Sequence, residues 1–138
     1  MNRKTGRVVE TSTAHVPARI ALAHAYARVA KAELHSVEHA SRSVSAGNAV
    51  LAAIAASDVL CIIHLGLRSG STNHSDAVEL LREFDTEAAR DLVVLIKDKA
   101  HAHYGVSPVD RDTLTRMIRS MDRLITRANE AVARLKLE

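Results

Sequence analysis

An apolar repeat near the end of the chain places the strongest constraint on the fold. Between Pro108 and Leu135, apolar residues recur every three or four positions over roughly three heptads. This period is that of an α-helix, and its regularity is close to the spacing of a coiled coil. A helix with one continuous apolar stripe needs other helices to cover it. The repeat consists of Leu114, Met117, Ile118, Met121, Leu124, Ile125, Ala128, Val132 and Leu135.

The composition favours helices along the whole chain. The 138 residues include two Tyr, one Phe and no Trp, with five Gly and two Pro. A chain so poor in aromatic and turn-forming residues can hardly build a β-sandwich. Hydrophobic residues make up 47% of the chain, which is enough for the core of one domain. The net charge of +3 is compatible with an anionic partner such as RNA but does not require one.

Local signals define the first half of the chain. Residues 1–12 are polar and basic and are expected to form a flexible tail, with residues 13–138 as a single domain. Thr13 is predicted to cap a first helix that ends near Ser43, with Pro17 in its first turn. The basic N-terminus has no apolar run behind it, and the single cysteine, Cys61, excludes an intramolecular disulfide. A reducing, cytoplasmic location is therefore expected.

The next segment, 45–67, is apolar almost all round and is predicted to be the second helix. Such a helix lies at the centre of a bundle or crosses a membrane. Asp58 in its middle favours the bundle, so no membrane association is expected. A buried carboxylate needs a partner. The candidates on the adjoining helix are Lys97, Lys99, His101 and His103.

Capping signals define the second half. After a polar loop at 68–73, Asp76 and Glu79 have the spacing of a capping pair, and Asp85 begins a second N-terminal pattern. Residues 75–103 are therefore predicted to be helical with a break near Phe84–Asp85. Ser107-Pro108-Val109-Asp110 has the residues that begin a helix. The sequence thus predicts an all-α, up-and-down antiparallel bundle of four major helices, the third of them broken.

The first candidate site is the segment from Lys97 to Tyr104. It holds two Lys, two His, one Asp and one Tyr within eight residues. Histidine transfers protons near neutral pH, lysine stabilises a developing phosphate charge, and tyrosine orients or donates. Such a set suits RNA cleavage without a metal, in which the 2′-hydroxyl attacks the neighbouring phosphodiester. The alternative is that cations gather at a helix C-terminus because the helix dipole favours them there.

Two further patterns have functional and structural explanations. His35 and His39 are four residues apart, but spacing supplies no third ligand, so neither a metal nor another cofactor is expected. An arginine stripe along the last helix can contact phosphates or form a solvated face, in which Asp112 pairs with Arg116. The stripe consists of Arg116, Arg123, Arg127 and Arg134, flanked by Arg119.

The motifs in the second half of the chain resemble a known family. An Ala-rich apolar helix ends in Ile62-Ile63-His64-Leu65-Gly66, and Asn73-His74 follows in a polar loop. Later come Lys97-Asp98-Lys99-Ala100-His101-Ala102-His103-Tyr104-Gly105 and then Ser107-Pro108. Over roughly residues 15–135, this pattern resembles the HEPN superfamily (higher eukaryotes and prokaryotes nucleotide-binding), and most of all its small bacterial members.

The resemblance implies a four- or five-helix bundle and a motif of Arg, four to six residues, then His. Lys97, five residues and His103 match this motif, with Lys in place of the family's Arg. Lysine keeps the charge but loses the planar, bidentate grip on phosphate. The resemblance further implies a homodimer in which two motifs face one cleft, related by a two-fold axis.

The function implied by the resemblance is RNA binding or metal-independent endoribonuclease activity, of the kind that a toxin with an antitoxin partner carries out. His103 would be the general acid/base with His101 in reserve, Lys97 the phosphate contact, Asp98 the polar support and Tyr104 the orienting hydroxyl. The candidate nucleic-acid contacts are Arg68, Lys99, Arg116 and Arg119. The alternatives are a noncatalytic helical module for dimerisation or protein interaction, and a small-ligand binder.

Overall fold

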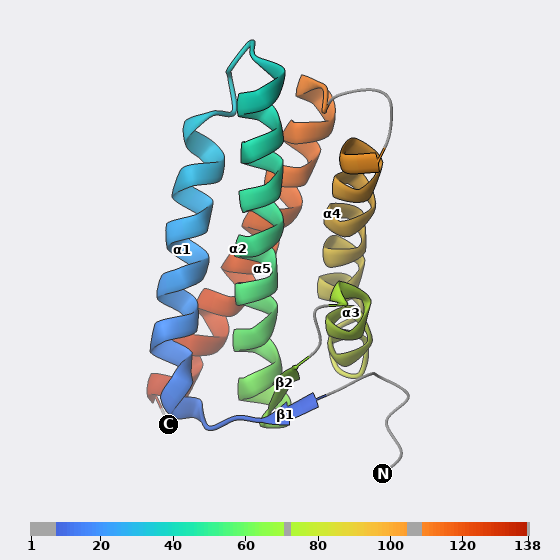
Figure 1. Ribbon diagram of the computed structural model, residues 1–138. Coiled ribbons are helices and arrows are strands. Elements are labelled where there is room, and N and C mark those ends of the chain that lie inside the picture. The colour runs from blue at the N-terminus through green and yellow to red at the C-terminus, as the bar shows by residue number, and fades with distance from the viewer. Residues whose placement is uncertain (1–7, 71–72, 105–108, 138) are drawn as a thin grey trace.

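The protein is an antiparallel bundle of helices (Figure 1). The computed structural model describes residues 8–70, 73–104 and 109–137, and for residues 101–104 and 137 it describes the backbone alone. Four long helices run up and down beside one another, which confirms the predicted all-α class. They are α1 (Val16–Ala32), α2 (His39–Leu65), α4 (Thr86–Tyr104) and α5 (Arg111–Leu137). The short elements are β1 (Val8–Glu10), η1 (Thr13–His15), β2 (Leu67–Ser69) and α3 (His74–Arg82).

The apolar helix α2 lies at the centre and packs against the other four α-helices. Within the described residues, it is the one helix long and apolar enough to span a membrane, and 72% of its most apolar stretch is buried inside the protein. Its apolar surface is therefore largely used for packing within the bundle.

Alanine sets the spacing between α1 and α2. Ala23 and Ala30 of α1 and Ala49 and Ala53 of α2 are fully buried. Because a methyl group is the whole side chain, the backbones of two such helices can approach closely. On the other side of α2, leucine and methionine side chains fill the space, with Met121 of α5 fully buried. The predicted seam of α5 is thus part of the core.

The predicted first helix, ending near Ser43, is wrong. The structure ends α1 at Ala32 and begins α2 at His39. The side chain of Ser36 turns the link by accepting a hydrogen bond from the backbone N–H of Glu38. Buried Arg42 then fixes it, donating from Nη1 to the Ser36 carbonyl and from Nε to the Val109 carbonyl at the start of α5 (2.8 Å). No Gly or Pro marks this turn, so the pattern of residues did not indicate it.

The predicted break near Phe84–Asp85 is confirmed, because α3 ends at Arg82 and α4 begins at Thr86. Asp85 caps α4, its Oδ1 accepting a hydrogen bond from the Ala88 N–H at 3.0 Å. The predicted cap of α3 was misplaced, because Asn73, not Asp76, caps this helix.

The first cap is likewise shifted, because Ser12, not Thr13, accepts a hydrogen bond at the start of η1. Pro17 does lie in the first turn of α1, as predicted. The predicted start of the last helix, Ser107-Pro108, lies outside the described residues. The described helix begins at Arg111, where Asp110 accepts a hydrogen bond from the Thr113 N–H at 2.7 Å. This bond lowers the pKa of Asp110.

Part of the predicted tail is ordered. Val8–Glu10 forms β1 and pairs antiparallel with β2, with Val9 opposite Arg68. Gly66, at φ 68°, ends α2 in the left-handed region, which glycine adopts at little cost. The Gly66 carbonyl then accepts a hydrogen bond from the Thr11 N–H at 2.9 Å. This two-stranded sheet of distant segments brings the start of the chain against the end of α2, whereas residues 1–7 lie outside the described part.

Candidate functional site

The segment predicted as a site occupies the last turns of α4. The helix backbone continues through Tyr104, so Lys97 and His101 are one turn apart, and so are Lys99 and His103. The Lys97 side chain is exposed, and the Lys99 side chain is half-buried. The side chains of His101, His103 and Tyr104 lie outside the described residues. Lys97 and His103 are six residues apart, so the register places Lys99, rather than Lys97, on the side of α4 that carries His103.

A histidine that was not among the predicted site residues lies beside this segment. His74 is the first residue of α3, which packs along α4. The pKa of His74 is lowered, mainly because the imidazole is partly buried and secondly because of the positive charge of Lys99. The imidazole is therefore neutral at physiological pH, as a general base must be. In the sequence, Asn73 and His74 lie at the end of a polar loop, and only the packing of α3 on α4 brings them towards Lys99.

Asp98 and Arg116, predicted for two different roles, form one ion pair. The Asp98 carboxylate accepts hydrogen bonds from Arg116 Nε at 3.1 Å and from Nη2 at 3.0 Å. These hydrogen bonds raise the pKa of Arg116. The carboxylate of Asp98 is therefore directed at α5, while Lys99 acts on His74 of α3. Arg119, one turn beyond Arg116, is exposed.

The arginine stripe of α5 forms a ladder with acidic residues of α4. Arg123 Nη2 lies 2.8 Å from Asp91 Oδ1, one heptad along both helices from the Arg116–Asp98 pair. Arg127 continues the ladder, pairing with Asp85 at 2.9 Å and also with Glu87. The stripe therefore holds α4 against α5. Arg116 pairs with Asp98 across this interface, and not with Asp112 of its own helix as predicted. Few of its charges are left for phosphates.

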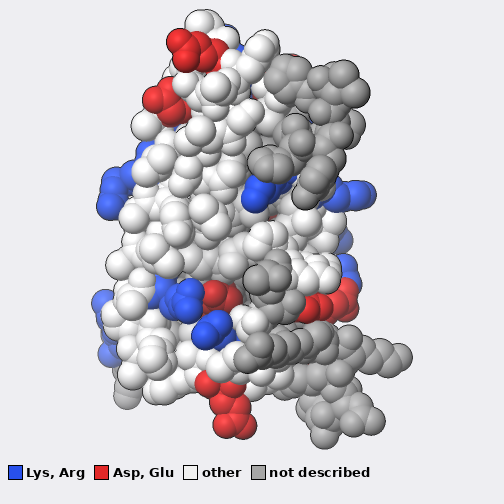
Figure 2. All heavy atoms as spheres, in the orientation of Figure 1, with Lys and Arg blue, Asp and Glu red and all other residues white. Residues whose placement is uncertain are grey.

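Asp58 has a different partner from those predicted. None of the candidates on α4 pairs with it within the described residues; instead Arg19 Nη1 of α1 lies 3.5 Å from Asp58 Oδ2. Burial raises the pKa of Asp58 to about 6, although the positive charges of Arg19 and, to a smaller extent, Arg68 act in the opposite direction. An acidic group lies among basic ones on this face of α2 (Figure 2). α1 and β2 flank the lower end of α2, and the prediction from sequence had considered only α4.

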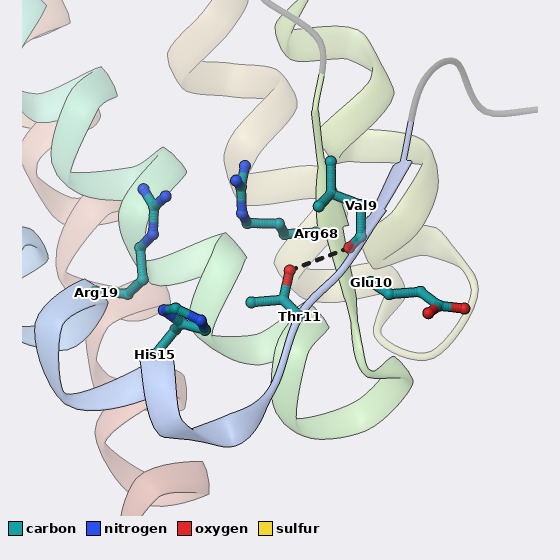
Figure 3. A pocket seen from close by; sticks show the side chains of 6 residues that line it. All are labelled: Val9, Glu10, Thr11, His15, Arg19 and Arg68. Carbon is teal, nitrogen blue, oxygen red and sulfur yellow. Dashed lines mark hydrogen bonds between the residues drawn. The ribbon is translucent and has the colours of Figure 1, made fainter.

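A small pocket opens beside this pair, between η1, α1 and the sheet of β1 and β2 (Figure 3). Its volume is about 280 Å³. Arg19, Arg68 and His15 surround it, while the Glu10 side chain points away from the two arginines (Figure 3). Arg68, predicted as a nucleic-acid contact, thus lies at the strand end of the bundle, apart from the last turns of α4 (Figure 1).

His35 and His39 do not share a helix. His35 lies in the link after α1, and His39 is the first residue of α2. The Nδ1 atom of His39 contacts Arg42. In the described part of the chain, no group of three or more His, Cys, Asp or Glu side chains is arranged to hold a metal ion.

Comparison with protein-family models, with curated proteins and with solved structures gives no match for this chain. Its function is therefore inferred from the residues and their placement. Two places concentrate chemistry: the last turns of α4 with His74, and the pocket beside Asp58.

Proposed function

We propose that this protein is a HEPN-like RNA-binding protein that cleaves RNA without a metal at the last turns of α4. The single observation that carries the proposal is that α3 packs on α4 so that His74, with a pKa lowered first by burial, lies within the electrostatic reach of Lys99. A neutral imidazole next to an ammonium group is the combination that activates a 2′-hydroxyl and stabilises the charge on the attacked phosphate. The resemblance to HEPN proteins assigns the same segment to catalysis.

In this proposal the proton-transfer roles are divided between two histidines. His74 takes the proton from the 2′-hydroxyl, and His103 gives a proton to the leaving oxygen, with His101 in reserve. Lys99 contacts the phosphate that is attacked, Lys97 contacts a neighbouring phosphate of the RNA, and Tyr104 orients the substrate. Asp98 does not contact the substrate, because its carboxylate holds Arg116. Lys97 can replace the family's arginine because it keeps the positive charge, although it lacks the bidentate grip of arginine on phosphate.

RNA cleavage by matched variants tests this proposal. Purified wild type, H103A and H74Q are incubated with total RNA in the presence of a metal chelator. The proposal expects cleavage by wild type and a loss of at least about a hundredfold in each variant, since a general acid or base contributes that much. H24Q, which removes a histidine that contacts Asn129 far from this segment, serves as the control and should cleave normally. Absence of cleavage by wild type, or equal cleavage by all four proteins, would rule the nuclease out.

A second function, self-association as a helical module, is favoured by an exposed apolar face on α1 and α2. Leu22 and Val29 on α1, and Val44 and Leu51 on α2, are 39% to 54% exposed and are spaced by one heptad on each helix. The surface over these two helices is broadly uncharged (Figure 2). Large side chains exposed in such a row usually mark an interaction surface.

The charges around this face favour a second copy of the chain as its partner. Exposed Glu33 and Glu38 lie at one end, in the α1–α2 link, and Arg19 and Arg68 lie at the other. A two-fold axis that sets the helices of two copies antiparallel would bring the acidic end of each against the basic end of the other.

The oligomeric state tests this second function. Light scattering after gel filtration should give a dimer for wild type and a monomer for V29E/V44E. T126E/T115E adds the same charge on α5, away from this face, and should remain dimeric. A monomeric wild type, or a dimer that survives V29E/V44E, would exclude this surface.

A further inference from the structure

We propose that the pocket formed by Arg19, Arg68 and His15 binds a phosphate-type oxyanion, and that Asp58 couples this binding to the uptake of a proton. The site lies at the strand end of the bundle, apart from the last turns of α4 (Figure 1). It therefore stands whether or not the protein acts on RNA.

The geometry of the pocket suits a small anion. Two guanidinium groups and an imidazole come from three different elements and surround one opening (Figure 3). The Arg68 side chain is held in place because its Nη1 donates a hydrogen bond to the Ser69 carbonyl at 3.2 Å. The Arg19 side chain is 33% exposed. Planar guanidinium groups bind tetrahedral oxyanions through paired N–H donors. A cavity of about 280 Å³ is at the small end of ligand pockets, which favours a phosphate group over a large molecule.

Asp58 supplies the coupling, because it competes with the anion for the same guanidinium groups. Its side chain is only 8% exposed, and its ion pair with Arg19 is 3.5 Å long. The charged groups that act on it are Arg19 from α1 and Arg68 from β2. When Asp58 is ionised it neutralises one of the two positive charges. When it is protonated, both guanidinium groups are free to bind an anion from solution.

The pKa of Asp58, raised to about 6 by burial, places this exchange near neutral pH. A bound anion removes the attraction that favours the ionised carboxylate, so binding the anion and binding the proton favour each other. Anion affinity should therefore rise as the pH falls from about 7.5 to about 5.5, by more than about tenfold if the occupied state requires neutral Asp58.

Sulfate is the probe of choice because it keeps its double negative charge throughout this pH range. Sulfate is titrated into the full chain, with sodium chloride as the ionic-strength control, and the Nε–H signals of the arginines are followed by NMR. Wild type should bind with the predicted pH dependence. D58N/H15Q, which mimics the protonated carboxyl and removes the imidazole of the pocket, should bind sulfate at both pH values with less than about a twofold difference. H15Q should bind more weakly but keep the pH dependence, which separates His15 from Asp58.

The site itself is tested in the D58N background, where removal of an arginine leaves no buried charge unpaired. D58N/R19Q and D58N/R68Q should lose sulfate binding, while D58N/R28Q, which removes an exposed arginine elsewhere on α1, should keep it. No sulfate binding by wild type at either pH, or equal binding by all arginine variants, would overturn the site. A pH dependence in D58N/H15Q equal to that of H15Q would overturn the coupling. Inorganic phosphate and a nucleoside monophosphate then show whether the free ion or a phosphorylated molecule binds better.

Discussion

Replacing Asp58 with Asn should stabilise the protein, and more so as the pH rises. The pKa of this carboxyl is raised from 3.8 to about 6 in the folded protein. Each tenfold difference in proton affinity corresponds to about 1.4 kcal/mol, so ionised Asp58 opposes folding by about 3 kcal/mol above pH 6. The folded chain binds the proton more tightly than the unfolded chain. The stabilising contribution of protonated Asp58 is therefore complete below pH 3.8 and is lost as the pH rises through about 6.

Urea unfolding followed by helical circular dichroism measures this effect. The advantage of D58N over wild type should grow by about 2 kcal/mol between about pH 4.5 and about pH 8, since part of the total is already present at the lower pH. D112N, which removes an exposed carboxylate from α5, controls for the loss of one negative charge. An advantage that stays constant with pH, or a D58N variant less stable than wild type at about pH 8, would refute the reasoning.

Three further predictions concern other described contacts. H74Q should lose less stability than wild type on acidification below pH 6.5, because a histidine whose folded pKa is lowered resists the proton that the unfolded chain accepts; urea unfolding across this range checks the sign. R123Q should destabilise by about 1–2 kcal/mol, since Asp91 is buried but the arginine is half exposed; adding D91N should recover part of the loss in a double-mutant cycle. D85A should lower stability by about 1 kcal/mol through loss of the α4 cap, and hydrogen exchange should show this first turn opening more than the rest of α4.

Much of the fold could be predicted because it depends on patterns along a single segment. The apolar period of α5, the apolar character of α2 and the break at Asp85 are local signals, and all three appear in the structure. The link after Ala32 was missed because its stabilising group is remote. Arg42 holds it by bonds to Ser36 and to the Val109 carbonyl, and no local residue type announces such a contact.

The candidate sites were harder to predict because each depends on which helices are neighbours. A buried Asp58 could be expected to need a cation, but its choice of Arg19 follows from the packing of α1 on α2. Burial of His74, and after it the charge of Lys99, lowers the pKa of His74 only once the α3–α4 hairpin has formed. One signal was available for the arginine ladder: acids and arginines recur at heptad spacing on α4 and α5, as antiparallel neighbours require.

The salt dependence of RNA binding tests the central proposal most directly. Single-stranded RNA is titrated into wild type, into K97Q/K99Q and into R28Q/R134Q, which removes two exposed arginines elsewhere, at several salt concentrations. The proposal predicts that K97Q/K99Q binds more weakly and that its slope of log affinity against log salt is smaller by about 1.4, since each phosphate contact on a single strand contributes about 0.7. R28Q/R134Q should keep the wild-type slope. Equal slopes for all three proteins, or no RNA binding by wild type, would contradict it.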